Sequence, residues 1–407
     1  MDTEKDISNQ DTPPIGVEKT DLSINDFQRT FGVNLADAID LDTWSLGANL
    51  ADLYPVIEQE WYKAKLDESQ HQKTFREYVF PRIQATANVP FAGLNSQAEE
   101  IMHLLPRIHR GFLFNGAVTA CGSTLSAYNT VPLAITQIGV CLINYEKQHG
   151  SYSHRLFSRD LRFKSEDLIQ EALDLIEKRK NIDNAEDARG RLSNLAVRGI
   201  KAFMERTILL NKKSAQSKWI LGSGSPAPYE LMTNFWGSQR EMADKAIELM
   251  RKMILDHQRF VYVQSCERFR DLWTLGNALL PYEFLILGSL KDDLTRRVDQ
   301  GGTRDYIRDA YTNFAREVGS KIVRGLYKVS HQAQPQIFYG HIDHIRTAAL
   351  IAMADSAFQL HKGTPMLMDL ASILCQQSFN QGDLTSAAEQ AQLKAEIRIR
   401  TSNLSKK

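Results

Sequence analysis

The stretch from Phe112 to Glu146 constrains the fold most, because it holds two long apolar runs separated by a polar connection. The first run ends at Cys121 and Gly122, and the second, rich in Val, Ile and Leu, leads to Tyr145. Glycine can adopt backbone angles closed to other residues, and the connection up to Asn129 is rich in turn-forming residues. The pattern predicts two strands paired as a long hairpin, and we expect any active site at the end of the first strand, at Cys121.

Length and composition are those of an ordinary globular protein. The chain has 407 residues, of which 43% are hydrophobic and 24% charged, enough for two or three domains or one elaborated α/β domain. Lys plus Arg and Asp plus Glu both number 49, so any binding of nucleic acid must come from local patches. No apolar run approaches the roughly 20 residues that cross a bilayer, and the polar N-terminus is unlike a signal peptide. We expect a cytoplasmic protein without membrane association.

Most of the remaining local motifs argue against a zinc site, a disulfide framework and a nucleotide-binding P-loop. The cysteines are scattered with no C-x-x-C pair, which speaks against a zinc site and a disulfide framework. No G-x-x-x-x-G-K-[ST] loop is present, so the chain is not itself a P-loop ATPase. His341, Asp343 and His344 are the densest group of potential metal ligands, and an extended segment would put the first two on one face. The alternative, which we favour, is a polar turn between two strands.

The chain divides into four segments. Residues 1–23 lack periodicity and predict a flexible tail, and residues 24–105 carry apolar side chains at helical spacing. Residues 106–383 alternate strands with helices, which indicates crossover connections and an α/β sheet. Residues 384–407 predict a charged C-terminal helix or tail. Beyond the hairpin, we expect strands at 151–163, 219–221 and 260–264 and around a turn at 340–343, and helices at 165–180, 185–210, 239–257, 269–279, 304–328 and 366–379.

The order of these segments resembles the NurA nucleases. In that family two strands each end in a small loop with Asp-Gly-Ser or a close variant, and here the loops follow residues 120 and 221. Three later segments are similar to the family's G-Y-I-S-R-P-R-S strand, its F-Y-L…I-A-R-V-E-I-P hairpin and its G-Y-P-x-x-L-x-x-A-H motif: "FVYVQSCERFRD", "FYGHIDHIRTAAL" and "GTPMLMDLASIL". The likeness spans Phe112 to Phe379 and rests on the shared order and spacing of the motifs.

This resemblance implies an α/β protein with an RNase H-like mixed sheet flanked by helices, over residues 106–383, with a helical N-terminal extension. It further implies a homodimer that docks on a hexameric HerA-type ATPase, which feeds DNA to the nuclease. In the family, carboxylates hold Mn²⁺ or Mg²⁺, which activates water and stabilises the departing oxygen of the phosphodiester.

Matching the family motifs to this sequence shows where carboxylates are replaced. The first aspartate falls on Cys121, the second on Ser223, and the histidine of the A-H motif on Ser372. Hard cations prefer carboxylate oxygens, whereas a serine hydroxyl is a poor neutral ligand and a thiolate suits softer metals. We therefore expect no ordinary two-metal catalysis at these positions.

Three further positions match functional residues of the family. Glu205 corresponds to the helical glutamate of the family, and the match implies that it is a metal ligand. Tyr262 corresponds to the tyrosine of the strand and Arg346 to the arginine of the late hairpin. Each residue also has a purely structural interpretation. Glu205 could be a solvated surface glutamate, Tyr262 a half-buried aromatic of the sheet, and Arg346 a solvated charge beside a sheet edge. Cys121 likewise has the alternative of a small buried residue instead of a reactive thiol.

Three hypotheses about function follow. The first is a NurA relative with weak or lost nuclease activity that serves as partner of a HerA-type DNA translocase in DNA end processing or defence. The second is an active Mn²⁺- or Mg²⁺-dependent nuclease in which Glu205, with Asp343 or Asp369, supplies relocated carboxylates. The third is a structural α/β scaffold unrelated to NurA.

Overall fold

The chain divides into two compact units, residues 1–71 and 72–407. The computed structural model describes residues 24–44, 50–95, 98–130, 133–159, 194–232, 240–267, 269–300 and 305–404. The tail predicted at residues 1–23 and the helix predicted at 165–180 lie outside the described residues.

The first unit is helical, as the apolar spacing of its sequence predicts. It holds α1 (Ile24–Phe31), α2 (Leu35–Ile39), a 3₁₀ turn (Leu41–Thr43) and most of α3 (Leu50–Thr74). The Trp44 indole N–H donates a hydrogen bond to the Ala38 carbonyl oxygen at 3.2 Å, which ties the 3₁₀ turn to α2. The predicted helical N-terminal extension is therefore present.

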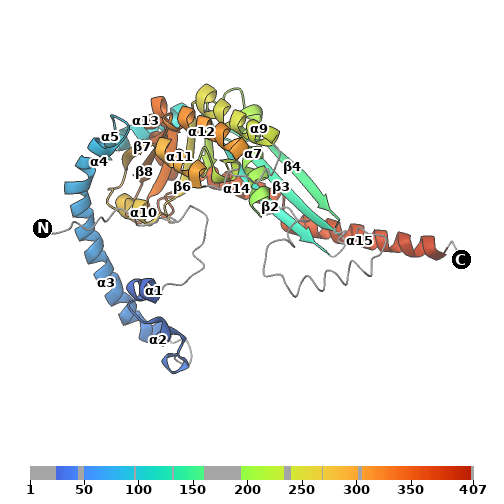
Figure 1. Cartoon of the computed structure of the whole chain (residues 1–407), viewed down its shortest axis with the longest axis horizontal. Helices are drawn as coiled ribbons and strands as arrows, with labels where there is room; N and C mark the ends of the chain where they lie inside the picture. Colours follow the sequence, from blue (N-terminus) through green and yellow to red (C-terminus); the bar gives the residue numbers. More distant parts are fainter. Residues whose placement is uncertain are drawn as a thin grey trace. The chain divides into compact units, whose positions relative to one another are not determined.

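The second unit is built on a nine-stranded mixed sheet in the order β1-β7-β8-β9-β6-β5-β2-β3-β4 (Figure 1). The strands are β1 (Gly93–Leu94), β2 (Val118–Asn129), β3 (Ala134–Ile143), β4 (Gln148–Ser158), β5 (Trp219–Ser223), β6 (Phe260–Ser265), β7 (Glu283–Ser289), β8 (Ile322–Lys328) and β9 (Gln336–His341). The helices are α4 (Phe80–Thr86), α5 (Ala98–Ile108), α7 (Asn194–Lys212), α8 (Tyr229–Met232), α9 (Arg240–Arg251), α10 (Arg270–Asn277), α11 (Lys291–Gln300), α12 (Asp305–Gly319), α13 (Ile345–Ser356), α14 (Met366–Ser378) and α15 (Gln381–Leu404).

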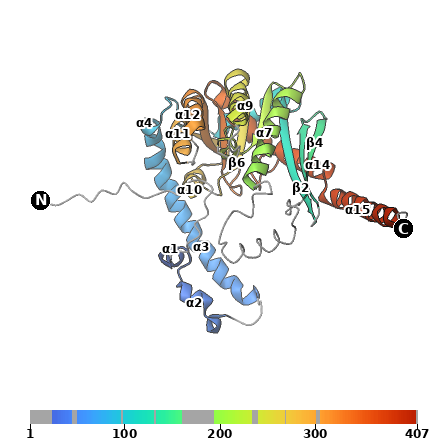
Figure 2. The same cartoon turned by 45° about the vertical axis from the view of Figure 1, so that its right-hand side comes forward.

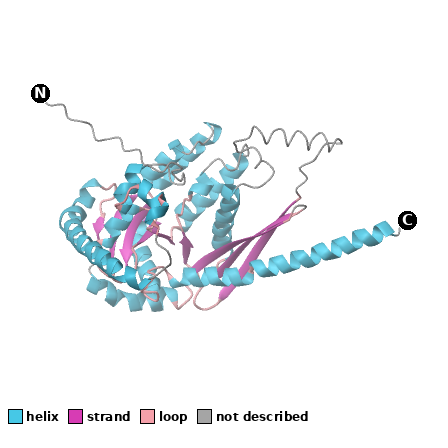
Figure 3. Ribbon diagram, turned by 90° about the horizontal axis from the view of Figure 1, so that it is seen from below, coloured by secondary structure: helices cyan, strands magenta, loops and turns pink. Residues whose placement is uncertain are grey.

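The long hairpin predicted from the sequence is present as β2 and β3, which pair antiparallel with Cys121 opposite Leu142. Its turn lies later than expected, because β2 continues through Gly122 to Asn129. Ten paired residues of β3 override the local turn preference of this polar stretch. Cys121 therefore lies inside a strand and not at its end. The predicted third strand is β4, and Figure 3 shows these three long strands side by side.

The strand order gives the fold class. Counted along the chain from β2 to β6, these five strands are numbers 1 to 5, and across the sheet from β4 to β6 they lie in the order 3-2-1-4-5. Strand β3, number 2, is antiparallel to its neighbours, whereas β2, β5 and β6 are mutually parallel. This is the arrangement of an RNase H-like sheet. The predicted mixed α/β sheet of RNase H type is confirmed, and β9, β8, β7 and β1 extend it antiparallel beyond β6.

Two layers of helices cover the two faces of the sheet. Helices α7, α8, α9, α11 and α12 pack on the face that carries Ile220, Phe260 and Tyr262, which we call the α7 face (Figure 2). Helices α5, α13 and α14 pack on the face that carries Leu221 and Val261, which we call the α14 face. Successive side chains of a strand point to opposite faces, so a one-residue step decides which layer a residue joins.

Two predicted elements are wrong. The second strand expected after the turn at residues 340–343 is a helix: β9 ends at His341, Ile342–His344 form a 3₁₀ turn, and α13 follows. Nearly all of α13 is buried and much of it is alanine, the best helix former, so an apolar run was mistaken for a strand. The helix expected over 304–328 ends at Gly319, and β8 takes over with Ile322 and Val323, whose branched side chains favour a strand.

Helix α14 is held close against β2. The Asp355 carboxylate accepts a hydrogen bond from the backbone N–H of Leu367, in the first turn of α14, at 2.9 Å, and another from the Tyr145 hydroxyl. Burial raises the pKa of Asp355 to about 6. A Cβ atom at Gly122 would collide with the backbone of Ala371 and lie 2.5 Å from the Ser372 nitrogen. Only glycine leaves room for this approach of helix and strand.

The variant Gly122→Ala is expected to lose about 1–3 kcal/mol of unfolding free energy, because its methyl group must push α14 away from the sheet. Urea denaturation monitored by circular dichroism measures the loss. The control is Gly111→Ala, where nothing lies within 4 Å of the added Cβ atom. Equal unfolding midpoints for Gly122→Ala and the wild type would contradict this packing.

Candidate functional site

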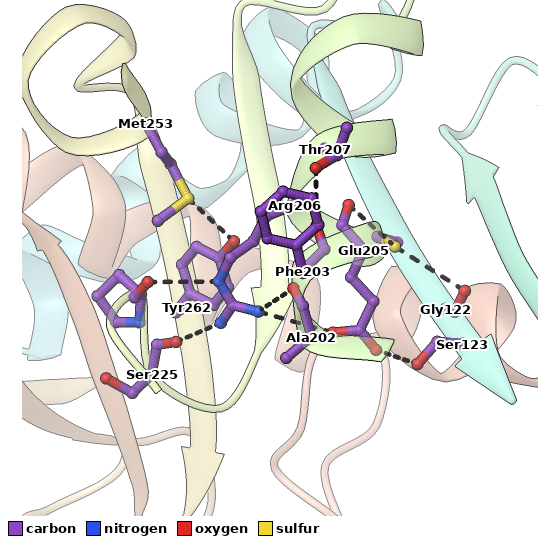
Figure 4. Close-up of polar contacts among 12 residues, drawn as sticks. Gly122, Ser123, Ala202, Phe203, Glu205, Arg206, Thr207, Ser225, Met253 and Tyr262 are labelled. Atoms are coloured by element: carbon purple, nitrogen blue, oxygen red, sulfur yellow. Dashed lines mark hydrogen bonds and ion pairs between the residues drawn. The ribbon is translucent and has the colours of Figure 1, made fainter. Parts of the chain in front are cut away.

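Glu205 on α7 lies against β2. The Ser123 hydroxyl donates a hydrogen bond to Oε1 of the Glu205 carboxylate, whose side chain is 24% exposed (Figure 4). Ser123 and Cys121 are two residues apart in the strand and therefore share the α7 face. The structure thus places Cys121 and Ser123 beside Glu205, which is not a freely solvated surface residue.

Cys121 is a buried thiol. Its Sγ atom lies 3.8 Å from the carbonyl oxygen of Gly122 and 4.0 Å from that of Glu205. Burial, and next the negative charge of Glu205, raise the pKa of Cys121 well above its ordinary value. A neutral thiol is neither a nucleophile nor a metal ligand, so the environment of Cys121 suits a small core residue.

Arg206 is the most unusual residue of the site, because its guanidinium is buried with only 3% of its side chain exposed. Its Nη1 atom lies 3.8 Å from the Glu205 carboxylate, and its Cζ atom lies 5.1 Å from the centre of the Tyr262 ring. It donates three hydrogen bonds to backbone carbonyl oxygens, of Ala202 at 2.8 Å, Ser225 at 2.5 Å and Pro226 at 3.3 Å. The cation is thereby fixed between α7 and the loop that follows β5.

Tyr262 contributes its ring to this group and turns its hydroxyl elsewhere. The hydroxyl donates to the Met253 sulfur at 3.1 Å, and burial raises the pKa of Tyr262 to about 12. An aromatic face attracts a cation, so the ring stabilises the Arg206 guanidinium. Tyr262 is fully buried in the sheet and therefore acts here as a support for Arg206.

Ser223, Ser372 and Arg346 do not join Glu205. A Cβ atom at Gly222 would collide with the Tyr262 ring on the α7 face, so the next residue, Ser223, points to the α14 face. Ser372 lies on α14 beside Gly122, also on that side of the sheet. Arg346, on α13, is exposed and forms an ion pair with Glu100 of α5.

The other carboxylates considered from the sequence have partners of their own. The Asp343 carboxylate lies 3.4 Å from His341 Nδ1, beyond the end of β9, and Asp369 forms an ion pair with Lys362 at 2.9 Å. Because β9 is antiparallel to β6, Asp343 lies at the end of the sheet where β6 begins, opposite to the end that carries Ser223. Within the described ranges, no group of three His, Cys, Asp or Glu residues could hold a metal ion.

The residues around Glu205 do not fit Mn²⁺ or Mg²⁺. These ions take several oxygen ligands, chiefly carboxylates, and the group offers one carboxylate, a hydroxyl and a neutral thiol. The Arg206 guanidinium also brings a fixed positive charge within 3.8 Å of that carboxylate. Like charges at such distances repel strongly in a partly buried site, so Arg206 opposes the binding of a divalent cation.

Two residues of this group, Arg206 and Ser123, were not predicted from the sequence. Arg206 stands four residues after Ala202 and three before the buried Leu209, on the inward stripe of α7. A charged residue on such a stripe is the signal that could have indicated a buried functional or structural cation. Ser123 belongs to the polar connection after Gly122, whose composition indicates only a turn.

Comparison with solved structures finds NurA nucleases and endonuclease V. The NurA nuclease from Sulfolobus solfataricus aligns over 86% of this chain and 98% of its own, with 9% identity and a TM-score of 0.43. A NurA structure with manganese aligns over 77% of this chain and 93% of its own, with 10% identity and a TM-score of 0.38. Endonuclease V from Bacillus subtilis aligns over 71% and 95%, with 8% identity and a TM-score of 0.27.

The chain is thus similar in structure to NurA nucleases, the family that its motifs resemble, and it also aligns with endonuclease V, which the sequence did not suggest. No family model and no curated protein matches the sequence. In the part of the chain that the structure describes, no helix combines the length and apolar character needed to span a membrane.

The variant Arg206→Met is expected to lose about 2–4 kcal/mol of unfolding free energy, because three carbonyl oxygens lose their donor and Glu205 loses its ion-pair partner. The control Arg198→Met removes an arginine of the same helix that is 59% exposed and 3.7 Å from Glu230, and is expected to cost less than about 0.5 kcal/mol. Chemical denaturation of both variants tests this. Similar losses in the two would show that Arg206 does not anchor α7.

Proposed function

We propose that this chain is a NurA-like protein with weak or lost intrinsic nuclease activity, which acts as a homodimer with a HerA-type hexameric DNA translocase in DNA end processing or defence. The order of NurA-like motifs along the sequence supports the family assignment. The observation that carries the loss of activity is the Arg206 guanidinium, which lies beside the single carboxylate of the site.

The physical argument concerns charge. In the family, carboxylates at the ends of two strands attract divalent cations; here Cys121 is a neutral buried thiol and Ser223 points to the other face of the sheet. The positive charge of Arg206 is permanent, because the guanidinium stays protonated at all relevant pH values. The Arg206 guanidinium in this position stabilises the fold without a metal ion. The domain therefore keeps its structure without metal-dependent cleavage of DNA.

The same contacts count against a nuclease with relocated ligands. Such a site would need Asp343 or Asp369 near Glu205, and each of these is paired with another residue. Asp343 also lies toward the opposite end of the sheet. Relocated carboxylates remain the alternative that the cleavage experiment is designed to detect.

Labelled single- and double-stranded DNA, incubated with the purified protein and Mn²⁺ or Mg²⁺, is expected to remain uncut by the wild type and by Glu205→Ala alike. The control variant is Glu241→Ala, which removes an exposed carboxylate paired with Lys245. Metal-dependent cleavage that is lost in Glu205→Ala and kept in Glu241→Ala would overturn the proposal in favour of the relocated site.

The partner is tested by mixing the protein with a HerA-type ATPase and separating the mixture by size-exclusion chromatography. The proposal expects one co-eluting complex that retains DNA-dependent ATPase activity. Separate elution of the two proteins at all ratios would count against a NurA-like role and favour an unrelated scaffold.

A further inference from the structure

A polar cavity of about 400 Å³ opens at the end of the sheet where β5 and β6 begin. This is the end opposite to Ser223 and the loop that Arg206 binds. Its walls come from the residues that precede the two strands and from the turn after β9. The charged and imidazole side chains in the lining, which we call the basic pocket, are Lys213, Lys218, Asp256, His257, Arg259 and His344.

Positive charge prevails in the basic pocket, with three lysine or arginine side chains against the carboxylate of Asp256. Lys213 is held in the wall by a hydrogen bond from its ammonium to the Ser217 carbonyl oxygen at 2.7 Å. Burial lowers the pKa of Lys213, so its surroundings disfavour the charged form. Lys218 and Arg259 are exposed at the opening. Cations gathered in one cavity repel each other, and a bound anion would relieve that repulsion.

His257 adds a second, independent observation. Its Nε2 atom is buried and, among the described residues, has no hydrogen-bond partner. Burial, followed by the charge of Lys213, lowers the pKa of His257 to about 4, which leaves the imidazole neutral. Buried polar atoms are almost always hydrogen-bonded, so an orphaned nitrogen in the wall of a polar cavity indicates a missing ligand or solvent partner.

The geometry points to a binding site for a terminal phosphate, the dianion of a phosphate monoester, in the basic pocket. Three basic side chains from two loops converge there, which suits a dianion better than the single charge of an internal phosphodiester. Arg259 offers the planar fork that matches phosphate oxygens, and the lysines act as point charges. Among the described residues, the lining holds no phenylalanine, tyrosine or tryptophan on which a base could stack, and Trp219, next to Lys218, is buried. The pocket therefore recognises the phosphate and not the base.

This site is independent of the Glu205 group and of nuclease activity, since it lies at the other end of the sheet and shares no residue with it. The terminal phosphate could belong to a DNA end or to a free nucleotide. Both sources present the same phosphate group to the pocket. The experiment distinguishes them by comparing a mononucleotide with oligonucleotides that carry or lack a 5′-phosphate.

The test follows the histidine resonances of the full-length protein by NMR during titration with inorganic phosphate, thymidine monophosphate, and an oligothymidylate with a 5′-phosphate or a 5′-hydroxyl. We expect inorganic phosphate to shift the His257 resonance and to raise the pKa of His257 above about 4, because an anion stabilises the protonated ring. The 5′-phosphorylated oligonucleotide should bind at least about tenfold more tightly than its 5′-hydroxyl counterpart if the source is a DNA end. Binding of the mononucleotide without that preference assigns the site to free nucleotides.

The double variant Lys218→Ala/Arg259→Ala should weaken phosphate binding at least about tenfold, since it removes two charges from the opening. Both side chains are exposed, and circular dichroism verifies that the variant is folded. The control Lys252→Ala, an exposed lysine outside the basic pocket, should bind as the wild type does. A His257 resonance unmoved by every phosphate ligand, or binding that survives the double variant unchanged, would overturn the proposal.

Discussion

The buried guanidinium of Arg206 ties together three parts of the fold. It bonds to the carbonyl oxygens of α7 and of the loop after β5, and it lies over the ring of Tyr262 in β6. A buried charge is tolerated only where hydrogen bonds and an opposite charge compensate the loss of water, and here Glu205 and the carbonyls do so. The position of α7 on the sheet, and with it the position of Glu205, depends on this arrangement.

The two ends of the sheet use positive charge in opposite ways. At the end that carries Ser223, the cation is internal: Arg206 satisfies the site from within and leaves a single carboxylate for any ligand. At the end where β5 and β6 begin, the cations line an open cavity with an orphaned His257 nitrogen. The first arrangement stabilises the fold, and the second is the one we propose for recognition of a phosphate.

Much of the fold was predictable because it depends on local patterns. The long apolar runs of β2 and β3 predict the hairpin, and short buried runs separated by helices predict an α/β sheet. The RNase H-like arrangement of that sheet was implied only by the resemblance of the motifs to NurA. The end of β2 and the nature of residues 345–356 were not predictable, since pairing with β3 and complete burial override the local preferences of these segments. Glu205 was singled out by its match to the helical glutamate of the family, and its role as a site residue stays a prediction. Arg206 depends on contacts with residues up to 56 positions away, which no local pattern reveals.

The most direct measurement is the anomalous diffraction of manganese in crystals of the protein soaked in Mn²⁺. If the Arg206 guanidinium takes the place of metal at this site, no anomalous peak will appear near the Glu205 carboxylate, and the ion pair will keep its geometry. A manganese peak bound by Glu205 together with a second carboxylate, with Arg206 displaced from Tyr262, would contradict the account.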